Sequence, residues 1–272
     1  MGFGFTFRPE AQSPEPKALV VHSSVLAPAP EPEPPQTARP ILPLERLGAA
    51  LEILLCTGFP TQLLLIAIMT MSGMRMQTAD GHLSPPFVFT LSIVDTVLVI
   101  GLVLFFLNAH RQPARDVLLG HRRTLGEVAI GLALLPAAFL VVIGVLGAIR
   151  LLAPQLHNVP QNPLEDMLRS RGDAMIFAVV VMIAGGVREE VQRGFILYRF
   201  EQYLGGGIVG LLVFSTLFGL GHIEQGRDAA IATGLLGAFW GAVYLTRRSI
   251  VAPMVSHAAF NLAQLVKYLS LA

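Results

Sequence analysis

The chain has 272 residues, of which 53% are hydrophobic and only 14% are charged. Soluble globular domains carry about 25% charged residues, and the mean hydropathy here is +0.63. The composition therefore excludes an ordinary water-soluble enzyme and predicts an integral membrane protein that is embedded in the lipid bilayer. The balance of 19 Lys and Arg against 18 Asp and Glu argues against a nucleic-acid partner. The single cysteine, Cys56, excludes an internal disulfide framework and a multi-cysteine metal site.

The N-terminal segment differs from the rest of the chain in its proline content. Ten of the 19 prolines fall between Pro9 and Pro43. Such a segment cannot pack a core and prefers extended, polyproline-like conformations. We therefore predict a disordered Pro-rich tail at residues 1–45 and a transmembrane helical bundle at residues 46–272.

Seven apolar segments follow the tail, and each is a candidate for a membrane-spanning helix, which needs about 20 apolar residues. In chain order they are Leu47–Met71, Phe87–Leu107, Val128–Ile149, Ala174–Val187, Gly205–Gly221, Ala229–Leu245 and Ile250–Val266. Pro60 is expected to kink the first segment. The last four are shorter and rich in glycine, which is typical of helices packed against other helices, and Gly237 and Gly241 form a close-approach pair. The predicted fold class is all-α, a polytopic membrane bundle of about seven transmembrane helices.

Arginine in the short loops predicts the orientation of the bundle, because loops rich in Lys and Arg stay in the cytoplasm. The loop after Phe87–Leu107 and the loop at 246–249 are the arginine-rich ones, with Arg111, Arg115, Arg122 and Arg123 in the first and Arg247 and Arg248 in the second. We therefore expect a cytoplasmic N-terminus and a plasma (inner) membrane location. The sequence does not predict the oligomeric state.

Ionisable side chains inside apolar segments are costly, so each one marks a candidate functional site. Glu52 and Asp95 stand alone in their segments, and for them we expect hydrogen-bonded roles in helix packing. Three other places form a set. They are the run from Arg188 to Arg193, the pair Phe218 and His222, and the pair His257 and Asn261.

Helix arithmetic indicates that the three places can meet at one depth. The glycines at 205–207 form a natural turn, and the midpoint between Glu189 and His222 falls in it. In an antiparallel hairpin both residues then lie about 24 Å from the turn. His257 and Asn261 lie about 14 to 20 Å from the turn near residues 247–249, on the same side. Their i,i+4 spacing places them on one helix face.

The residue types at this depth suit hydrolysis of an acyl bond. Glu189 or Glu190, shielded from bulk water, can act as a general base toward a water molecule, with His222 orienting that water or sharing its proton. His257 and Asn261 can donate to the oxyanion that develops at an attacked carbonyl. Alternatively, Glu189, His222 and His257 can bind one divalent metal such as zinc, with an open position for water.

At these residues the sequence resembles the CAAX-protease and bacteriocin-processing (CPBP, or Abi) family of intramembrane endopeptidases. That family's pattern is a diglutamate followed by Arg, then FxxxH, then HxxxN, on successive membrane helices. Phe218 with His222 and His257 with Asn261 match the second and third motifs, and the resemblance covers a catalytic core at about 170–270. It implies cleavage of a peptide or prenylated protein substrate at the membrane, by a mechanism that is either metal-dependent or of a metal-free glutamate type.

The first motif departs from the family pattern because it is one residue short. Aligned on Gly186, Glu189 is the first glutamate, which the resemblance implies to be catalytic. Aligned on Arg193, it becomes the second glutamate, and Arg188 takes the catalytic position. We favour Glu189 as the base with Glu190 nearby and Arg193 paired with a glutamate. The alternatives are a catalytically inactive membrane scaffold of the same family and an ion-coupled transporter.

Overall fold

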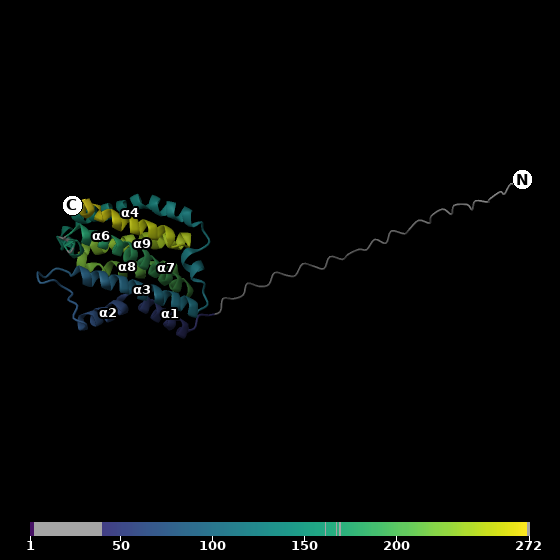
Figure 1. Cartoon of the computed structure of the whole chain (residues 1–272), viewed down its shortest axis with the longest axis horizontal. Helices are drawn as coiled ribbons and strands as arrows, with labels where there is room; N and C mark the ends of the chain where they lie inside the picture. The colour runs from purple at the N-terminus through teal and green to yellow at the C-terminus, as the bar shows by residue number, and fades with distance from the viewer. Residues whose placement is uncertain (3–39, 161, 167, 169, 271–272) are drawn as a thin grey trace. The chain divides into compact units, whose positions relative to one another are not determined.

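The computed structural model describes residues 1–2, 40–160, 162–166, 168 and 170–270, and this part of the chain is helical, without a β-strand (Figure 1). The all-α prediction is therefore confirmed. The α-helices are α1 (Pro43–Cys56), α2 (Phe59–Met71), α3 (Pro85–Ala109), α4 (Thr124–Leu152), α5 (Pro163–Asp166), α6 (Arg171–Val181), α7 (Glu189–Tyr203), α8 (Gly207–Leu220), α9 (Arg227–Arg247) and α10 (Val251–Ser270). Two π-helical segments, η1 (Arg115–Leu119) and η3 (Met182–Arg188), and two short 3₁₀ segments, η2 (Pro154–Leu156) and η4 (Ile223–Gln225), lie between them.

The predicted Pro-rich tail, 1–45, lies almost entirely outside the described residues. Its last three residues are helical, because α1 begins at Pro43. Proline suits the first helical turn, where its missing N–H costs nothing. The Glu45 carboxylate also accepts the backbone N–H of Leu42 at 2.8 Å, which caps this helix end.

The count of seven membrane-spanning helices is not confirmed. By length and composition, α3, α4 and α9 can each cross a membrane, and α1 with α2 passes the same test only as one pair bent by 43°. The segments predicted at 205–221 and 250–266 form shorter apolar helices, α8 and α10. The segment predicted at 174–187 is split between α6 and η3, and the helical run then continues into α7, which carries polar residues.

The bend in the first predicted span lies just before Pro60, not at it. The two helices are separated by Thr57 and Gly58, and Gly58 has a φ of 82°, a conformation that favours glycine. Pro60 then occupies the first turn of α2. The carbonyl of Cys56, left without a helical donor at the break, accepts from Gln192 Nε2 at 2.8 Å. The break is therefore held by a side chain of α7.

Close glycine contacts set the packing of the helices that follow. The turn predicted at 205–207 is present, with φ of 98° at both Gly205 and Gly206. The predicted close-approach pair on α9 is also confirmed. A Cβ at Gly237 would lie 2.9 Å from Phe218, and one at Gly241 would lie 2.4 Å from Leu211, so α8 packs directly on α9.

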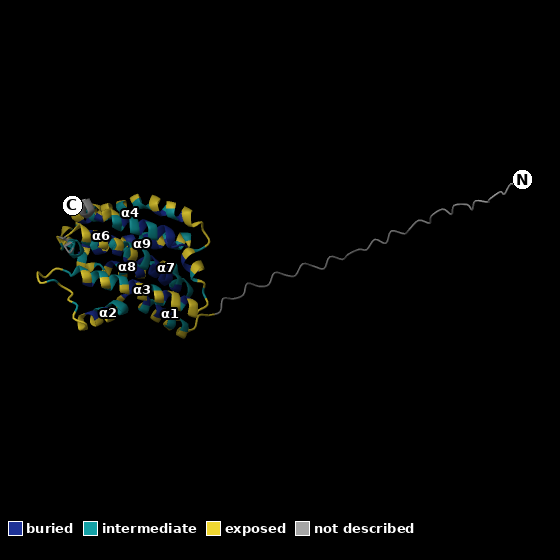
Figure 2. Ribbon diagram, in the orientation of Figure 1, coloured by how far each residue is buried: buried dark blue, intermediate teal, exposed yellow. Residues whose placement is uncertain are grey.

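Helix α7 occupies the interior of the bundle. In Figure 1, α1 and α2 form a V beside α3, while α10 runs along α4. Most of the first half of α7 is buried, as Figure 2 shows. The lone acid Glu52 on α1 accepts from Arg199 Nε of α7 at 2.7 Å and lies 2.6 Å from His110 Nε2. The predicted hydrogen-bonded packing role of Glu52 is therefore confirmed. Cys56, on the same helix, is fully buried.

The two arginine-rich loops lie at the same end of the bundle. The backbone N–H of Ile250 donates to the carbonyl of Leu118 at 2.8 Å. The Arg247 guanidinium binds both oxygens of Glu127, at 2.8 and 2.6 Å. This arrangement agrees with the requirement that both loops face one side of the membrane, and which side that is stays a prediction.

Candidate active site

The three polar motifs meet around two cavities that share a wall. Cavity A lies between α1, α2, α7 and α8, and cavity B lies between α3, α4, α6, α9 and α10. Glu189 and His222 line both cavities, whereas His257 and Asn261 line cavity B. The predicted convergence of the three sequence-distant motifs is therefore present in the structure.

The π-helical segment η3 brings the first motif to the cavities. A Cβ at Gly185 would lie 2.5 Å from Asn261 Nδ2, and one at Gly186 would lie 2.7 Å from the Ala258 Cβ. Because both glycines lack a Cβ, α10 can lie directly on η3. Single π-turns occur often at functional sites, and this one ends at Arg188, immediately before Glu189.

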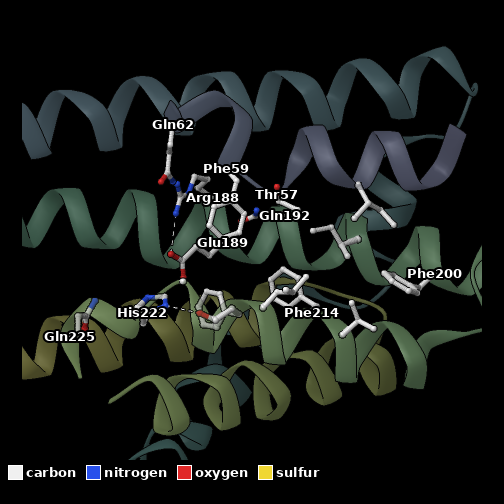
Figure 3. A pocket seen from close by; sticks show the side chains of 16 residues that line it. Thr57, Phe59, Gln62, Arg188, Glu189, Gln192, Phe200, Phe214, His222 and Gln225 are labelled. Atoms are coloured by element: carbon white, nitrogen blue, oxygen red, sulfur yellow. Dashed lines mark hydrogen bonds and ion pairs between the residues drawn. The ribbon is translucent and has the colours of Figure 1, made fainter. Parts of the chain in front are cut away.

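The carboxylate of Glu189 lies between Arg188 and His222, as Figure 3 shows. Its Oε1 accepts from Arg188 Nη2 at 3.1 Å. Its Oε2 lies 3.8 Å from His257 Nε2, which is too long for a hydrogen bond and short enough for one water molecule to contact both. One oxygen is therefore held by the protein, and the other is available in the cavity.

Glu190, in contrast, is only 1% exposed and lines neither cavity. Its Oε1 accepts from Arg193 Nη1 and lies 2.8 Å from His257 Nδ1. The sequence spacing left Glu189 as the i,i+4 partner of Arg193, but the structure pairs Arg193 with Glu190 at i,i+3. The fully buried guanidinium also lies 5.0 Å from the centre of the Phe218 ring, a cation–π distance.

His257 is fixed on two sides. An ionised carboxylate only accepts hydrogen bonds, so Nδ1 of His257 donates to Glu190 and Nε2 is left facing Glu189. The imidazole stacks on Trp240, with ring centres 3.9 Å apart and planes at 17°. Trp240 Nε1 in turn donates to Ser256 Oγ at 3.2 Å. The sequence analysis missed Trp240, and its only signal was being the single tryptophan of the chain, within an apolar segment.

His222 has a tautomer fixed by the backbone. It follows the end of α8, and its Nδ1 donates to the carbonyl of Phe218 at 2.8 Å. A neutral imidazole with a proton on Nδ1 has a lone pair on Nε2, which can accept a proton or a hydrogen bond from water. The FxxxH spacing itself produces this bond, because residues i and i+4 are neighbours on a helix.

Arg188 and Asp95 form a buried ion pair beside Glu189. Arg188 Nη1 donates to Asp95 Oδ2, and Asp95 also accepts from Thr61 Oγ1 and from Gln62 Nε2 at 3.1 Å. Asp95 was expected to have a hydrogen-bonded packing role, and it is hydrogen-bonded, but it also lies next to the site. A lone acid within an apolar segment was the signal for it.

The metal-binding arrangement is not formed by these side chains. Within the described part of the chain, no group of three His, Cys, Asp or Glu side chains is placed to hold one metal ion. In the predicted set of Glu189, His222 and His257, Nδ1 of each histidine is bonded, by Glu190 in His257 and by the Phe218 carbonyl in His222. Nε2 of each imidazole is left as the possible ligand atom, as in histidines that bind a metal. The metal-dependent alternative therefore stays a prediction, and we derive no step through a metal.

Comparison with known proteins identifies one family. Residues 171–263 match the family model described as type II CAAX prenyl endopeptidase Rce1-like, and this range contains all three motifs. No curated protein and no solved structure matches the chain. The helices that can cross a membrane, together with this match, indicate an integral membrane protein.

Proposed function

From the match of residues 171–263 to the type II CAAX prenyl endopeptidase Rce1-like family, we propose that the chain is an intramembrane endopeptidase of the CAAX-protease family. The proposed reaction is hydrolysis of a peptide bond in a prenylated or other membrane-associated substrate. One observation carries the proposal. The free oxygen of Glu189 faces His257 Nε2 across a gap that one water molecule can bridge.

Glu189 is the proposed general base. Its Oε2 takes a proton from water, and the oxygen of that water attacks the carbonyl carbon of the scissile bond. His222, which has a lone pair on Nε2, orients the water or shares its proton. The proton then passes from Glu189 to the leaving nitrogen as the C–N bond breaks. The products are a carboxylic acid and an amine, which become a carboxylate and an ammonium group by transfer of the acid proton.

His257 and Asn261 are the proposed donors to the oxyanion. Both line cavity B. Donation through Nε2 uses the protonated imidazole of His257, whose Nδ1 donates to the buried Glu190. Glu190, paired with Arg193, is therefore proposed to position His257 and not to act as the base. Donors aimed at a developing oxyanion contribute about 10²–10³ in kcat.

The two cavities support a substrate with an apolar chain. The wall of cavity A includes apolar side chains of α7 and α8, among them Ile196, Phe200, Val213, Phe214 and Leu217. Such a wall suits a prenyl chain, while cavity B, lined by His257 and Asn261, suits the peptide. This division predicts that an unmodified peptide has a higher KM than its farnesylated form, with a smaller effect on kcat.

The test uses the purified full-length protein and an internally quenched peptide that ends in a farnesylated CAAX sequence. Glu189→Gln is expected to abolish cleavage, and Glu190→Gln is expected to retain a measurable rate. Loss in Glu190→Gln with normal cleavage in Glu189→Gln would reverse the two roles. A folded wild-type protein that cleaves neither the farnesylated nor the unmodified peptide would leave the inactive scaffold or the ion-coupled transporter as the better reading.

A further inference from the structure

A buried arginine beside the proposed base raises a chemical problem. Arg188 directly precedes Glu189, and its side chain is only 13% exposed. A guanidinium offers five N–H donors in a planar fork and readily binds both oxygens of a carboxylate. If Arg188 bound Glu189 in this way, both oxygens would be bonded to the cation, and each would be a weaker acceptor for a proton from water.

Asp95 prevents that arrangement. It is fully buried on α3 and takes Nη1 of Arg188, which leaves Nη2 to make one bond, at 3.1 Å, to Glu189 Oε1. Thr61 and Gln62 on α2 donate to the two oxygens of Asp95 and fix its orientation. The guanidinium is thus shared between two carboxylates.

The break between α1 and α2 lets this cluster form. A Cβ at Gly58 would lie 3.6 Å from Asp95 Oδ2 and 3.9 Å from Arg188 Nη1, so the backbone at the break lies against the ion pair. Thr61 Oγ1 also lies 2.9 Å from the carbonyl oxygen of Gly58. The Rce1-like match begins at residue 171, so α2 and α3 contribute these groups from outside the matched range.

We propose that Asp95 and Arg188 are positioning residues of the peptidase site: Asp95 restrains Arg188 so that it holds one oxygen of Glu189 and leaves the other free to activate water. This inference rests on the proposed function. It gives Arg188 a role that neither alignment of the shortened first motif supplies. It also makes Asp95 part of the catalytic apparatus through Arg188.

The experiment measures kcat and KM of full-length variants with the internally quenched farnesylated peptide. Asp95→Asn keeps the shape of the side chain and removes the charge, so Arg188 is left with Glu189 as its nearby counter-charge. We expect kcat to fall by about tenfold or more, with KM nearly unchanged. In Arg188→Gln, a further Asp95→Asn is expected to have no additional effect on kcat, because Asp95 acts through Arg188.

A matched control separates positioning from structural stabilisation. Glu127 is 2% exposed and, like Asp95, is bound by an arginine, Arg247, but it lines neither cavity. Glu127→Gln is expected to lower thermal stability without changing kcat of the folded enzyme. If Asp95→Asn behaves in the same way, or if the double variant has a much lower kcat than Arg188→Gln alone, the inference is wrong.

Two further variants keep the test decisive. If Asp95→Asn does not fold, Arg188→Lys tests the same inference, because one ammonium group cannot reproduce the planar guanidinium that binds two carboxylates. A wild-type kcat in Arg188→Lys would then overturn the inference. Glu189→Gln distinguishes failure of the proposed base from failure of the positioning role of Asp95 and Arg188. Wild-type activity in Glu189→Gln refutes the proposed base and this inference together, whereas an inactive Glu189→Gln beside a fully active Asp95→Asn refutes this inference alone.

Discussion

Gly185 offers a sharp test of the proposed oxyanion donors, because it is a small residue that touches the site without taking part in the chemistry. A Cβ at this position would lie 2.5 Å from Asn261 Nδ2 and 3.9 Å from His257 Nε2. Ordinary van der Waals contact begins near 3.4 Å. The substitution Gly185→Ala would therefore push the Asn261 amide away by about 1 Å, while His257 would keep its position.

The expected loss is large in activity and small in stability. A displacement of about 1 Å in a positioned group can cost about 10² in rate, and loss of one oxyanion donor costs about 10²–10³ in kcat, or about 2.7–4 kcal/mol. Overpacking lowers the free energy of unfolding by about 1–3 kcal/mol, and we expect a value near the low end because the clash involves only the end of a side chain. Alanine has a higher helix propensity than glycine, which offsets about 1 kcal/mol of this loss.

The assay compares kcat for the farnesylated quenched peptide with thermal unfolding of the same preparations. Gly147→Ala on α4 is the matched control, because a Cβ at Gly147 would meet nothing within 4 Å. We expect kcat to fall by about a hundredfold in Gly185→Ala and to stay at the wild-type value in Gly147→Ala. A Gly185→Ala enzyme with wild-type kcat would refute the placement of Asn261 at the oxyanion. So would a Gly185→Ala change that still lowers kcat in an Asn261→Ala background.

Three further predictions follow from the geometry. Arg193→Met would leave Glu190 as a buried charge without its arginine, which costs about 3–5 kcal/mol of folding free energy. We therefore expect a sharply lower melting temperature. A wild-type melting temperature would contradict the stabilising role of the Arg193–Glu190 pair. The proposed base activates water without a metal, so treatment with 1,10-phenanthroline is expected to leave cleavage unchanged. Inhibition reversed by zinc would instead establish the metal-dependent mechanism. For orientation, an impermeant maleimide is expected to label Gln155→Cys from outside the cell and Arg123→Cys only after lysis, and the opposite pattern would invert the predicted topology.

The sequence alone determined the membrane class and predicted which motifs meet at the candidate site. Composition required a membrane protein, and the period of the α-helix, applied from the glycine turn at 205–207, placed Glu189 and His222 at one depth. These inferences depend on local properties, namely hydropathy, turn chemistry and residue spacing. For the same reason, the turn at Gly205 and the close approach at Gly237 and Gly241 were predictable.

Tertiary structure decided how the charges are paired. The spacing of the shortened motif allowed Arg193 to bind either glutamate and left the place of Arg188 open. The structure pairs Arg193 with Glu190, three residues earlier on α7, and Arg188 at the end of η3 with Asp95 on α3.

The number of complete spans and the position of the first bend were likewise beyond the sequence. The bend depends on Gly58 and on Gln192, a residue 136 positions along the chain from the carbonyl that it binds. Asp95 and Arg188 are 93 residues apart. Helical periodicity predicts which side chains share a face of one helix, but the partner of a buried charge is chosen by packing between distant helices, because an unpaired charge in a low-dielectric interior is too costly to keep.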